Sequence, residues 1–271
     1  MDSVAVLLSV YAKDDPKALR SALESLWTQT YPVDIFVQQD GTLPEPLAGT
    51  LQKAYANGKI AYLGKRERNL GLAESLNELL AVLPSRYALV ARMDADDISI
   101  SHRIEKQVRF MRKHPEISVV GAWICEFDTC ESECERERRV PTEHDAIVAF
   151  AQYRNPMNHV SVLFRKEAVE AAGGYEHMNG FEDYFLWIRM LQKGYCFANI
   201  PEVLVKVRGG REMARRRRGW SYFKDEVRFI TAVKRLGFFS LAISFRNVII
   251  RAFPRLLPLF IVERLYNLLR K

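Results

Sequence analysis

The stretch that decides the fold is VARMDADDISISHRIEKQ, residues 90–107. It begins with apolar residues typical of a buried strand and then places Asp94, Asp96 and Asp97 close together. Alternate residues of an extended strand share a face, so Asp94 and Asp96 are predicted to point the same way. The segment that follows has the spacing of a helix. A strand that ends in carboxylates and leads into a helix predicts an α/β fold with a polar site at the strand end.

Outward from this stretch, apolar runs of strand length alternate with segments of helical period as far as about residue 120. This alternation is typical of βαβ units, and it predicts a Rossmann-like, mostly parallel sheet flanked by helices. The predicted strands cover residues 4–11, 33–40, 59–64, 87–94 and 117–127, and the predicted helices cover residues 16–30, 46–58, 69–84 and 101–115.

The pattern beyond residue 120 is less regular. The charged residues 131–139 predict an exposed loop or a helix end. From residue 158 the pattern resumes as a strand, a helix and a Gly-Gly turn, and residues 180–195 then predict an amphipathic helix. Glu182 and Asp183 lie in the first turn of that helix, where the positive end of the helix dipole favours carboxylates.

The strand ends are where a ligand is expected, because open α/β sheets bind ligands at the carboxyl ends of their strands. Two hard oxygen ligands, such as Asp94 and Asp96, suit Mg²⁺ or Mn²⁺ bridging to a diphosphate. A structural alternative is that Asp97 caps the next helix and its neighbours are solvated turn residues. Residues 9–16, SVYAKDDP, contain no glycine, and the chain has no GxxxxGK[ST] loop, so any nucleotide is bound without a glycine-rich phosphate loop.

The charge of the chain is divided unevenly. Residues 206–271 hold 17 Lys/Arg against 4 Asp/Glu, whereas residues 1–205 hold 23 against 29. The longest uncharged stretch of this basic tail, residues 236–245, is far shorter than the roughly 20 residues that span a bilayer. The tail is therefore expected to lie on an anionic membrane surface, with a packed helical subdomain as the alternative. No nucleic-acid-binding motif accompanies the arginines, so no nucleic acid partner is expected.

The cysteines and the N-terminus bear on localisation. Cys125, Cys130 and Cys134 lack the paired spacing of a zinc site, and with Cys196 they are expected as reduced thiols of a cytoplasmic protein. The N-terminal residues 1–16 lack the basic region and cleavage site of a signal peptide, and they predict a first strand instead.

The motifs in order resemble one known family. LLSVY, LRSALESLWTQTYP, VQQDGT, NLGLAESLN, ARMDADDISISHRIEKQ, HPEISVVGAW, NHVSVLFRKEAVEAAGGY and FEDYFLWIRM are similar to segments of the inverting family 2 glycosyltransferases of the GT-A fold. The likeness is greatest to bacterial enzymes of O-antigen and exopolysaccharide synthesis, such as the amylovoran type. It implies a catalytic domain of residues 1–208, with a nucleotide-sugar half to about residue 120 and an acceptor half over residues 121–208. Residues 209–271 form a basic helical extension outside it.

The resemblance also implies roles for individual residues. Asp183 matches the general base, with Glu182 beside it, and Asp94 and Asp96 match the ligands of Mn²⁺ or Mg²⁺. His159 and Trp187 fall near the acceptor, although packed core positions are the alternative for both. Gln39 stands where many members have an aspartate. The donor-binding residues implied are Ser9, Tyr11, Asp40, Asn69, Gly71, Leu72, Arg92, Asp94, Ala95 and Asp96.

The function expected from this resemblance is transfer of a hexose, with inversion, from a nucleotide-diphospho-sugar to a hydroxyl of a lipid-diphosphate-linked oligosaccharide. UDP is the expected nucleotide, and the inner face of a bacterial plasma membrane is the expected place. Two alternatives come from other classes: a nucleotidyltransferase, which would need a basic, glycine-rich loop after the first strand, and a non-catalytic scaffold on a degenerate GT-A fold.

Overall fold

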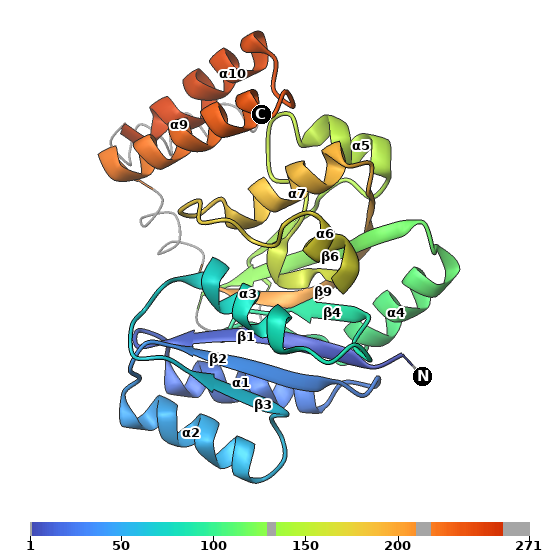
Figure 1. Ribbon diagram of the computed structural model, residues 1–271, viewed down its shortest axis with the longest axis vertical. Coiled ribbons are helices and arrows are strands. Elements are labelled where there is room, and N and C mark those ends of the chain that lie inside the picture. Colours follow the sequence, from blue (N-terminus) through green and yellow to red (C-terminus); the bar gives the residue numbers. More distant parts are fainter. Residues whose placement is uncertain (1, 129–133, 210–217, 257–271) are drawn as a thin grey trace.

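The architecture is a nine-stranded sheet between two layers of helices, with a helical layer at one end (Figure 1). The computed structural model describes residues 2–128, 134–209 and 218–256. The sheet order is β3-β2-β1-β4-β8-β6-β9-β5, and β7 pairs with β6. The strands are β1 Val4–Tyr11, β2 Asp34–Asp40, β3 Tyr62–Lys65, β4 Leu89–Arg92, β5 Ile98–Ser99, β6 Ile117–Phe127, β7 Arg136–Arg138, β8 Leu163–Arg165 and β9 Cys196–Arg208.

The helices follow the strands in the alternation expected of an α/β chain. Asp15 begins α1 by accepting hydrogen bonds from the backbone N–H groups of Lys17 and Ala18, and Pro16 suits the first helical position. The α-helices are α1 Pro16–Trp27, α2 Glu45–Ala56, α3 Leu72–Val82, α4 Arg103–Lys113, α5 His144–Phe150, α6 Lys166–Ala171, α7 Glu182–Gln192, α9 Gly219–Arg235 and α10 Leu241–Asn247. The short turns are η1 His159–Ser161 and η3 Phe253–Leu256, both 3₁₀, and the π-helical η2 Val248–Ala252.

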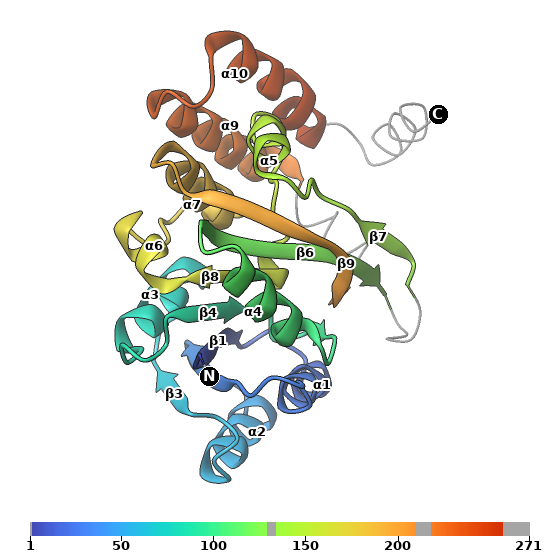
Figure 2. The same ribbon diagram turned by 90° about the vertical axis from the view of Figure 1, so that its right-hand side faces the viewer.

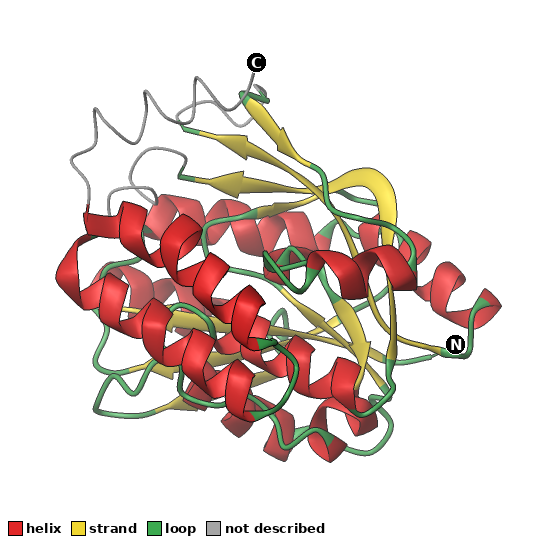
Figure 3. Ribbon diagram, turned by 90° about the horizontal axis from the view of Figure 1, so that it is seen from above, coloured by secondary structure: helices red, strands yellow, loops and turns green. Residues whose placement is uncertain are grey.

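The two faces of the sheet carry separate apolar clusters because side chains alternate along each strand. In β1, Val4, Val6 and Leu8 face the cluster that includes α1, α2 and α4. Ala5 and Leu7 face the other cluster, which includes α3, α6 and α7. Figures 2 and 3 show the sheet between these helices. A sheet buried on both faces explains why its strands read as nearly continuous apolar runs.

The direction of the strands sets where the polar site lies. Strands β3, β2, β1 and β4 are mutually parallel, so their carboxyl ends share one edge of the sheet. Strand β8 runs antiparallel to both β4 and β6, and β9 pairs in parallel with the long β6. Strand β9 also pairs with β5, which follows the carboxylate cluster directly. The sheet is thus mostly parallel and belongs to the predicted fold class.

The charged region after β6 differs from the expectation. Residues 136–138 form β7, an antiparallel partner of β6, where an exposed loop or helix end was predicted. This hairpin brings Cys125 and Cys134 together in a disulfide with a Cα–Cα distance of 5.6 Å. The expectation of reduced thiols is therefore wrong for this pair, because the hairpin creates a proximity that the sequence spacing does not reveal. Cys196 is a free thiol, and Cys130 lies outside the described residues.

The described part of the basic tail packs on the catalytic body. Phe229 of α9 lies against Phe181 and Tyr184 at the start of α7, with ring centroids 4.8 and 4.7 Å apart. These rings belong to an apolar cluster that α7 shares with α9, α10 and η2. The segment 218–256 therefore contributes to the core, as the alternative of a packed helical subdomain predicted. No helix within the described ranges is both long and apolar enough to span a bilayer.

An ion-pair cluster fixes the last turns of this layer. Glu226 of α9 is fully buried, and its carboxylate accepts hydrogen bonds from Nε of Arg251 at 2.8 Å and Nε of Arg255 at 2.9 Å. The two arginines come from η2 and η3, so a single carboxylate joins three elements. Removing one partner of a buried pair leaves uncompensated charge, which is costly.

Glu226→Gln is expected to lower the free energy of unfolding by about 2–4 kcal/mol, because Arg251 and Arg255 lose their buried counter-charge. The two arginines are partly exposed and recover some hydration, which keeps the loss from being larger. Urea unfolding followed by circular dichroism measures this change. The matched control is Glu24→Gln on the exposed side of α1, which is expected to have little effect. Equal stability of the two variants would contradict the role given to Glu226.

Candidate active site

The centre of the site is a cluster of three carboxylates after β4. The carboxylate oxygens of Asp94, Asp96 and Asp97 lie within 4.8 Å of one another. Asp97 is buried and accepts a hydrogen bond from the backbone N–H of Arg208 at 3.1 Å, which ties the cluster to the end of β9. The N-cap of α4 is His102, so the alternative that Asp97 caps this helix is wrong. Asp97 is a potential ligand that the DxD pattern did not identify.

The electrostatics of the cluster fit a divalent cation. Burial, with the neighbouring charge of Asp94, raises the pKa of Asp96 to about 6. The same causes, with Asp96 added, raise the pKa of Asp97 well above its ordinary value. Oδ2 of Asp97 is buried without a hydrogen-bond partner among the described residues. A hard cation would supply that partner and neutralise carboxylates that otherwise repel each other.

Arg92 lies between this cluster and the rest of the site. Its buried guanidinium forms an ion pair with Asp94, and its backbone carbonyl accepts a hydrogen bond from Nη2 of Arg103 at 2.8 Å. Arg103 is itself fully buried, and its Nε donates a hydrogen bond of 3.1 Å to Oε1 of Gln107. Burial, together with the charge of Arg92, lowers the pKa of Arg103 to about 9. Two buried arginines thus hold the strand end that presents the carboxylates.

Asp183 is the second residue of helix α7 and is the other acidic group of the predicted site. Nδ2 of Asn155 donates a hydrogen bond of 2.6 Å to Oδ2 of Asp183. Burial raises the pKa of Asp183, whereas the Asn155 hydrogen bond and the charges of Arg92 and Arg138 lower it. The pKa of the adjacent Glu182 is also raised, chiefly by burial. Asn155 is a second residue that the sequence did not identify.

The charge of Arg92 acts on the carboxylate cluster and on Asp183. Its positive charge lowers the pKa of Asp96 and of Asp97 in the cluster and also lowers the pKa of Asp183 at the start of α7. Because Coulomb interactions act over long distances, the charge of Arg92 influences both acidic groups, although the sequence separates them by nearly ninety residues.

The loop before α3 is anchored by Asp40 at the end of β2. Oδ1 of Asp40 accepts hydrogen bonds from Arg66 and from the N–H of Leu70, and Oδ2 accepts one from the N–H of Gly71. Gly71 adopts a φ of 91°, which a residue with a Cβ would adopt only with strain. Arg66 also pairs with Glu78. Asp40 therefore holds the loop of Asn69, Gly71 and Leu72 in place beside the strand ends.

The remaining predicted residues differ in accessibility. Ser9 and Tyr11 are half-buried near the end of β1, and Asn69 is exposed, with its Nδ2 donating to the carbonyl of Asp40 at 3.3 Å. Ala95 is buried in the core, so only its backbone faces the site.

The predicted acceptor residues separate into an accessible and an inaccessible one. His159 is half-buried in η1 and forms a 3.0 Å hydrogen bond with the hydroxyl of Tyr175. Burial lowers the pKa of His159 well below its ordinary value, and Arg92 lowers it further. Trp187 is fully buried behind His159, with the ring centroids 6.0 Å apart. The expectation that Trp187 contacts an acceptor is wrong, because its side chain is enclosed by the core.

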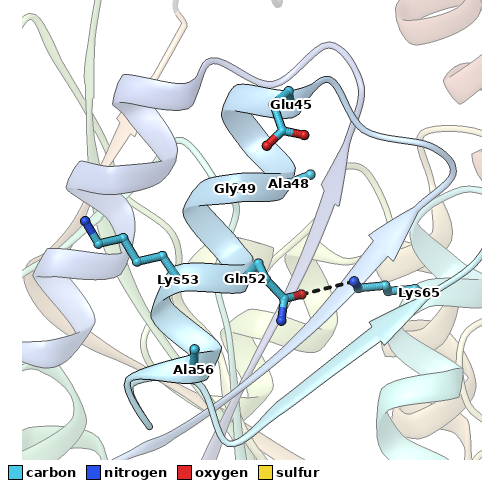
Figure 4. A pocket seen from close by; sticks show the side chains of 7 residues that line it. All are labelled: Glu45, Ala48, Gly49, Gln52, Lys53, Ala56 and Lys65. Carbon is cyan, nitrogen blue, oxygen red and sulfur yellow. Dashed lines mark hydrogen bonds between the residues drawn. The ribbon is translucent and has the colours of Figure 1, made fainter.

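A separate hollow lies on the outside of α2. It measures about 460 Å³ and is lined by Glu45, Ala48, Gly49, Gln52, Lys53, Ala56 and Lys65. Figure 4 shows Lys65 reaching Gln52 across it. None of the predicted site residues lines this hollow, and it contains no cluster of carboxylates. This hollow is thus separate from the carboxylates at the end of β4.

Comparison with known proteins agrees with this geometry. The family model described as glycosyl transferase family 2 matches residues 5–171. The chain is 41% identical over 271 residues to the amylovoran biosynthesis glycosyltransferase AmsE of Erwinia amylovora, a match that covers 98% of this chain and 99% of that protein. It is 32% identical to the UDP-Gal:alpha-D-GlcNAc-diphosphoundecaprenol beta-1,3-galactosyltransferase of Escherichia coli, covering 94% of this chain and 91% of that protein.

Solved structures support the fold. TarS 1–349 of S. aureus in complex with UDP-GlcNAc superposes with a TM-score of 0.62 at 14% identity, covering 84% of this chain and 66% of that one. The mannosyltransferase PcManGT of Pyrobaculum calidifontis, in complex with GDP-Man and Mn²⁺, gives 0.60 at 16% identity, covering 84% and 60%. The chain spans about two thirds or less of the length of these structures. They define the architecture as that of GT-A transferases.

The protein belongs to the family 2 glycosyltransferases. Its fold is the expected GT-A arrangement, and two of its relatives are named for amylovoran biosynthesis and for O-antigen biosynthesis.

Asp97→Asn is expected to weaken Mn²⁺ binding on the order of tenfold or more, because the substitution removes one negative charge from the cluster while keeping its shape. Titration of the full chain with Mn²⁺, followed by electron paramagnetic resonance, measures the affinity. Asp145→Asn, on the exposed surface of α5, serves as the matched control. Unchanged Mn²⁺ affinity in the Asp97 variant would remove Asp97 from the set of ligands.

Proposed function

We propose that the protein transfers a hexose with inversion from a UDP-linked sugar to a hydroxyl of a lipid-diphosphate-linked glycan, in the synthesis of a surface polysaccharide. The observation that carries this proposal is the cluster of Asp94, Asp96 and Asp97, to which the buried carboxylate of Asp183, hydrogen-bonded to Asn155, adds a second acidic centre. Inverting transfer needs two such centres, one for the leaving diphosphate and one for the proton of the acceptor.

The carboxylate cluster would hold the diphosphate end of the donor. Asp94 and Asp96, with Asp97, would bind Mn²⁺ or Mg²⁺, which when bound supplies positive charge to the leaving nucleoside diphosphate. Arg92 keeps Asp94 in place through their ion pair and adds a fixed positive charge to the same region. Metal dependence is thus a proposal that rests on the chemistry of these side chains.

The nucleotide would lie along the carboxyl ends of β1 and β2. Asp40 is expected near the base, and the Asn69, Gly71 and Leu72 loop, which Asp40 anchors, would cover the nucleotide from the side of α3. Because Gln39 replaces the aspartate that many members have, the contact with the base would use a different pattern of donors and acceptors. Ser9, Tyr11 and the backbone of Ala95 complete the proposed donor site.

Asp183 would act as the general base. A sugar hydroxyl is a weak nucleophile, and removal of its proton as it attacks the anomeric carbon lowers the barrier. Burial raises the pKa of Asp183 and makes it a better proton acceptor, whereas Asn155 and Arg92 lower that pKa and keep the carboxylate ionised. Glu182 lies beside it in the first turn of α7, and His159 is the accessible residue proposed to border the acceptor.

The substrates are proposed from the relatives. The E. coli relative is named for a UDP-Gal donor and a GlcNAc-diphosphoundecaprenol acceptor, and the TarS structures contain UDP-GlcNAc or UDP. A lipid-linked acceptor favours a place at the cytoplasmic face of the plasma membrane, with the basic C-terminal region on anionic lipid. A non-catalytic scaffold is less well supported, because a protein that only binds has no need of Asp183 in a buried, hydrogen-bonded position.

Asp183→Asn is expected to lower kcat roughly 10²–10⁴-fold, because an amide cannot accept the proton, and to leave the KM for the donor nearly unchanged. Transfer from a panel of UDP-sugars to a diphospho-lipid acceptor, followed by mass spectrometry of the product, measures this loss. Substantial transfer by this variant would exclude Asp183 as the base. A β-linked product from an α-linked donor would establish inversion.

Asn155→Ala is expected to move the acidic limb of the kcat/KM profile to higher pH. The base works when ionised, so the rate falls as the pH drops through the pKa of Asp183. The Asn155 hydrogen bond lowers that pKa, and its loss lets the pKa rise. The control is Asn179→Ala, at an exposed position in the loop before α7. A change in rate without any displacement of the profile would mean that Asn155 has only a structural role.

A further inference from the structure

The outer side of α10, η2 and η3 carries apolar side chains that nothing in the described structure covers. Leu241 is 71% exposed, Phe245 69%, Ile249 50% and Phe253 55%. These residues are four positions apart, so in consecutive helical turns they lie along one side. Ile250 and Leu256 extend the surface, and we call these six residues the outer stripe. Exposed apolar patches of this kind mark a site of interaction.

The inner side of the same turns belongs to the core. Asn247 and Ala252 are fully buried, and Ile243 and Val248 pack against the cluster shared with α7. The helical layer is therefore held in place on its inner side by packing and by the Glu226 ion pairs. The outer stripe is thus exposed on helical turns whose inner side is firmly packed.

The charges of the segment that carries the outer stripe have one sign. Residues 227–256, which follow Asp225 and the buried Glu226, contain six Lys/Arg and no Asp/Glu. Of these, Arg228, Lys234, Arg235 and Arg246 are exposed, and Arg246 directly follows Phe245. Apolar and aromatic side chains among basic residues are the composition that binds the headgroup region of an anionic bilayer. An interface with another copy of this chain would instead bring these cations against each other, which is unfavourable.

The inner side of this layer also contacts the loop that leads to the base. Nδ2 of Asn247 donates to the carbonyl of Gln152 at 2.9 Å, and Nη1 of Arg251 donates to the carbonyl of Tyr153 at 3.3 Å. The guanidinium of Arg246 lies 4.2 Å from the centre of the Tyr153 ring. Two residues further along, Asn155 holds Asp183. The helical layer of α9, α10, η2 and η3 thus carries the outer stripe on one side and contacts the loop that leads to the proposed base on the other. Figures 1 and 2 show α9 and α10 at one end of the molecule.

We infer that the outer stripe of α10, η2 and η3 is the surface by which the protein docks on an anionic lipid bilayer, with its acceptor side turned toward the lipid. The apolar side chains enter the interface, and the surrounding cations meet lipid phosphates. This inference rests on the proposed function for its purpose. The acceptor hydroxyl, on a sugar whose diphosphate lies at the headgroup level, would reach Asp183 only if this end of the protein faces the membrane.

The test compares the full chain with the double variant Phe245→Ser/Ile249→Ser in flotation with phosphatidylglycerol-containing vesicles and with pure phosphatidylcholine vesicles. The wild type is expected to bind the anionic vesicles, more weakly at high salt. The variant is expected to bind them roughly tenfold less tightly or weaker still, because it loses two apolar side chains from the interface. Tyr55→Ser/Val82→Ser, at exposed positions of α2 and α3, is the matched control and is expected to bind as the wild type does.

A kinetic readout separates this inference from the proposed function. The stripe variant is expected to lose transfer to a long-chain acceptor embedded in vesicles and to keep transfer to a short-chain, water-soluble acceptor. The retained activity also demonstrates that the variant is folded. If the wild type transfers sugar to neither acceptor, the proposed function fails. Vesicle flotation still tests whether the outer stripe binds an anionic bilayer.

Three results would overturn the inference. Undiminished vesicle binding by the stripe variant would place the membrane contact elsewhere. If the stripe variant binds vesicles as the wild type does but melts at a lower temperature, a segment of this chain, such as residues 257–271, would be the occupant of the stripe. A wild-type dimer in light scattering that the stripe variant converts to a monomer would identify a second copy as the occupant.

Discussion

The buried positive charge of Arg92 is the constraint on which the site depends. Three carboxylates after β4 and a fourth at the start of α7 would repel one another in a poorly hydrated interior. Arg92 reduces that repulsion by its ion pair with Asp94 and by its longer-range effect on Asp183. Arg103, behind it, fixes the backbone at this point through the carbonyl of Arg92. The strand end can therefore carry a dense negative charge and still fold.

Much of this fold followed from local patterns in the sequence. The bounds of β1 and β6 are those predicted, because long apolar runs with turn residues at their ends determine such strands. The short strands β7 and β8, of three residues each, were not delimited, since their pairing with β6 and β4 creates them and three residues carry no period. The disulfide between Cys125 and Cys134 has the same origin. It depends on a hairpin and not on a spacing motif.

The site could be predicted where its residues form a contiguous motif and not where tertiary contacts complete it. The carboxylates of the DxD pattern and the Glu-Asp pair of α7 were visible as motifs. For Asp97 the sequence left a helix cap as an alternative, because only the approach of β9 shows its partner, the N–H of Arg208. Asn155 comes from an irregular loop, and nothing in its neighbours along the chain indicates a contact with Asp183. Trp187 looked functional because a tryptophan on an amphipathic helix can face either way.

The C-terminal layer changes how the catalytic half should be understood. If α9 and α10 were only an appendage, their loss would leave Asp183 undisturbed. Instead, Phe229 stacks on the residue that precedes α7, and Asn247 and Arg251 hold the backbone that leads to Asn155. The position of the proposed base is thus supported by residues of the C-terminal layer, 46 to 68 positions further along the sequence. The outer stripe therefore lies on elements that directly contact the loop and the helix start which hold the proposed base.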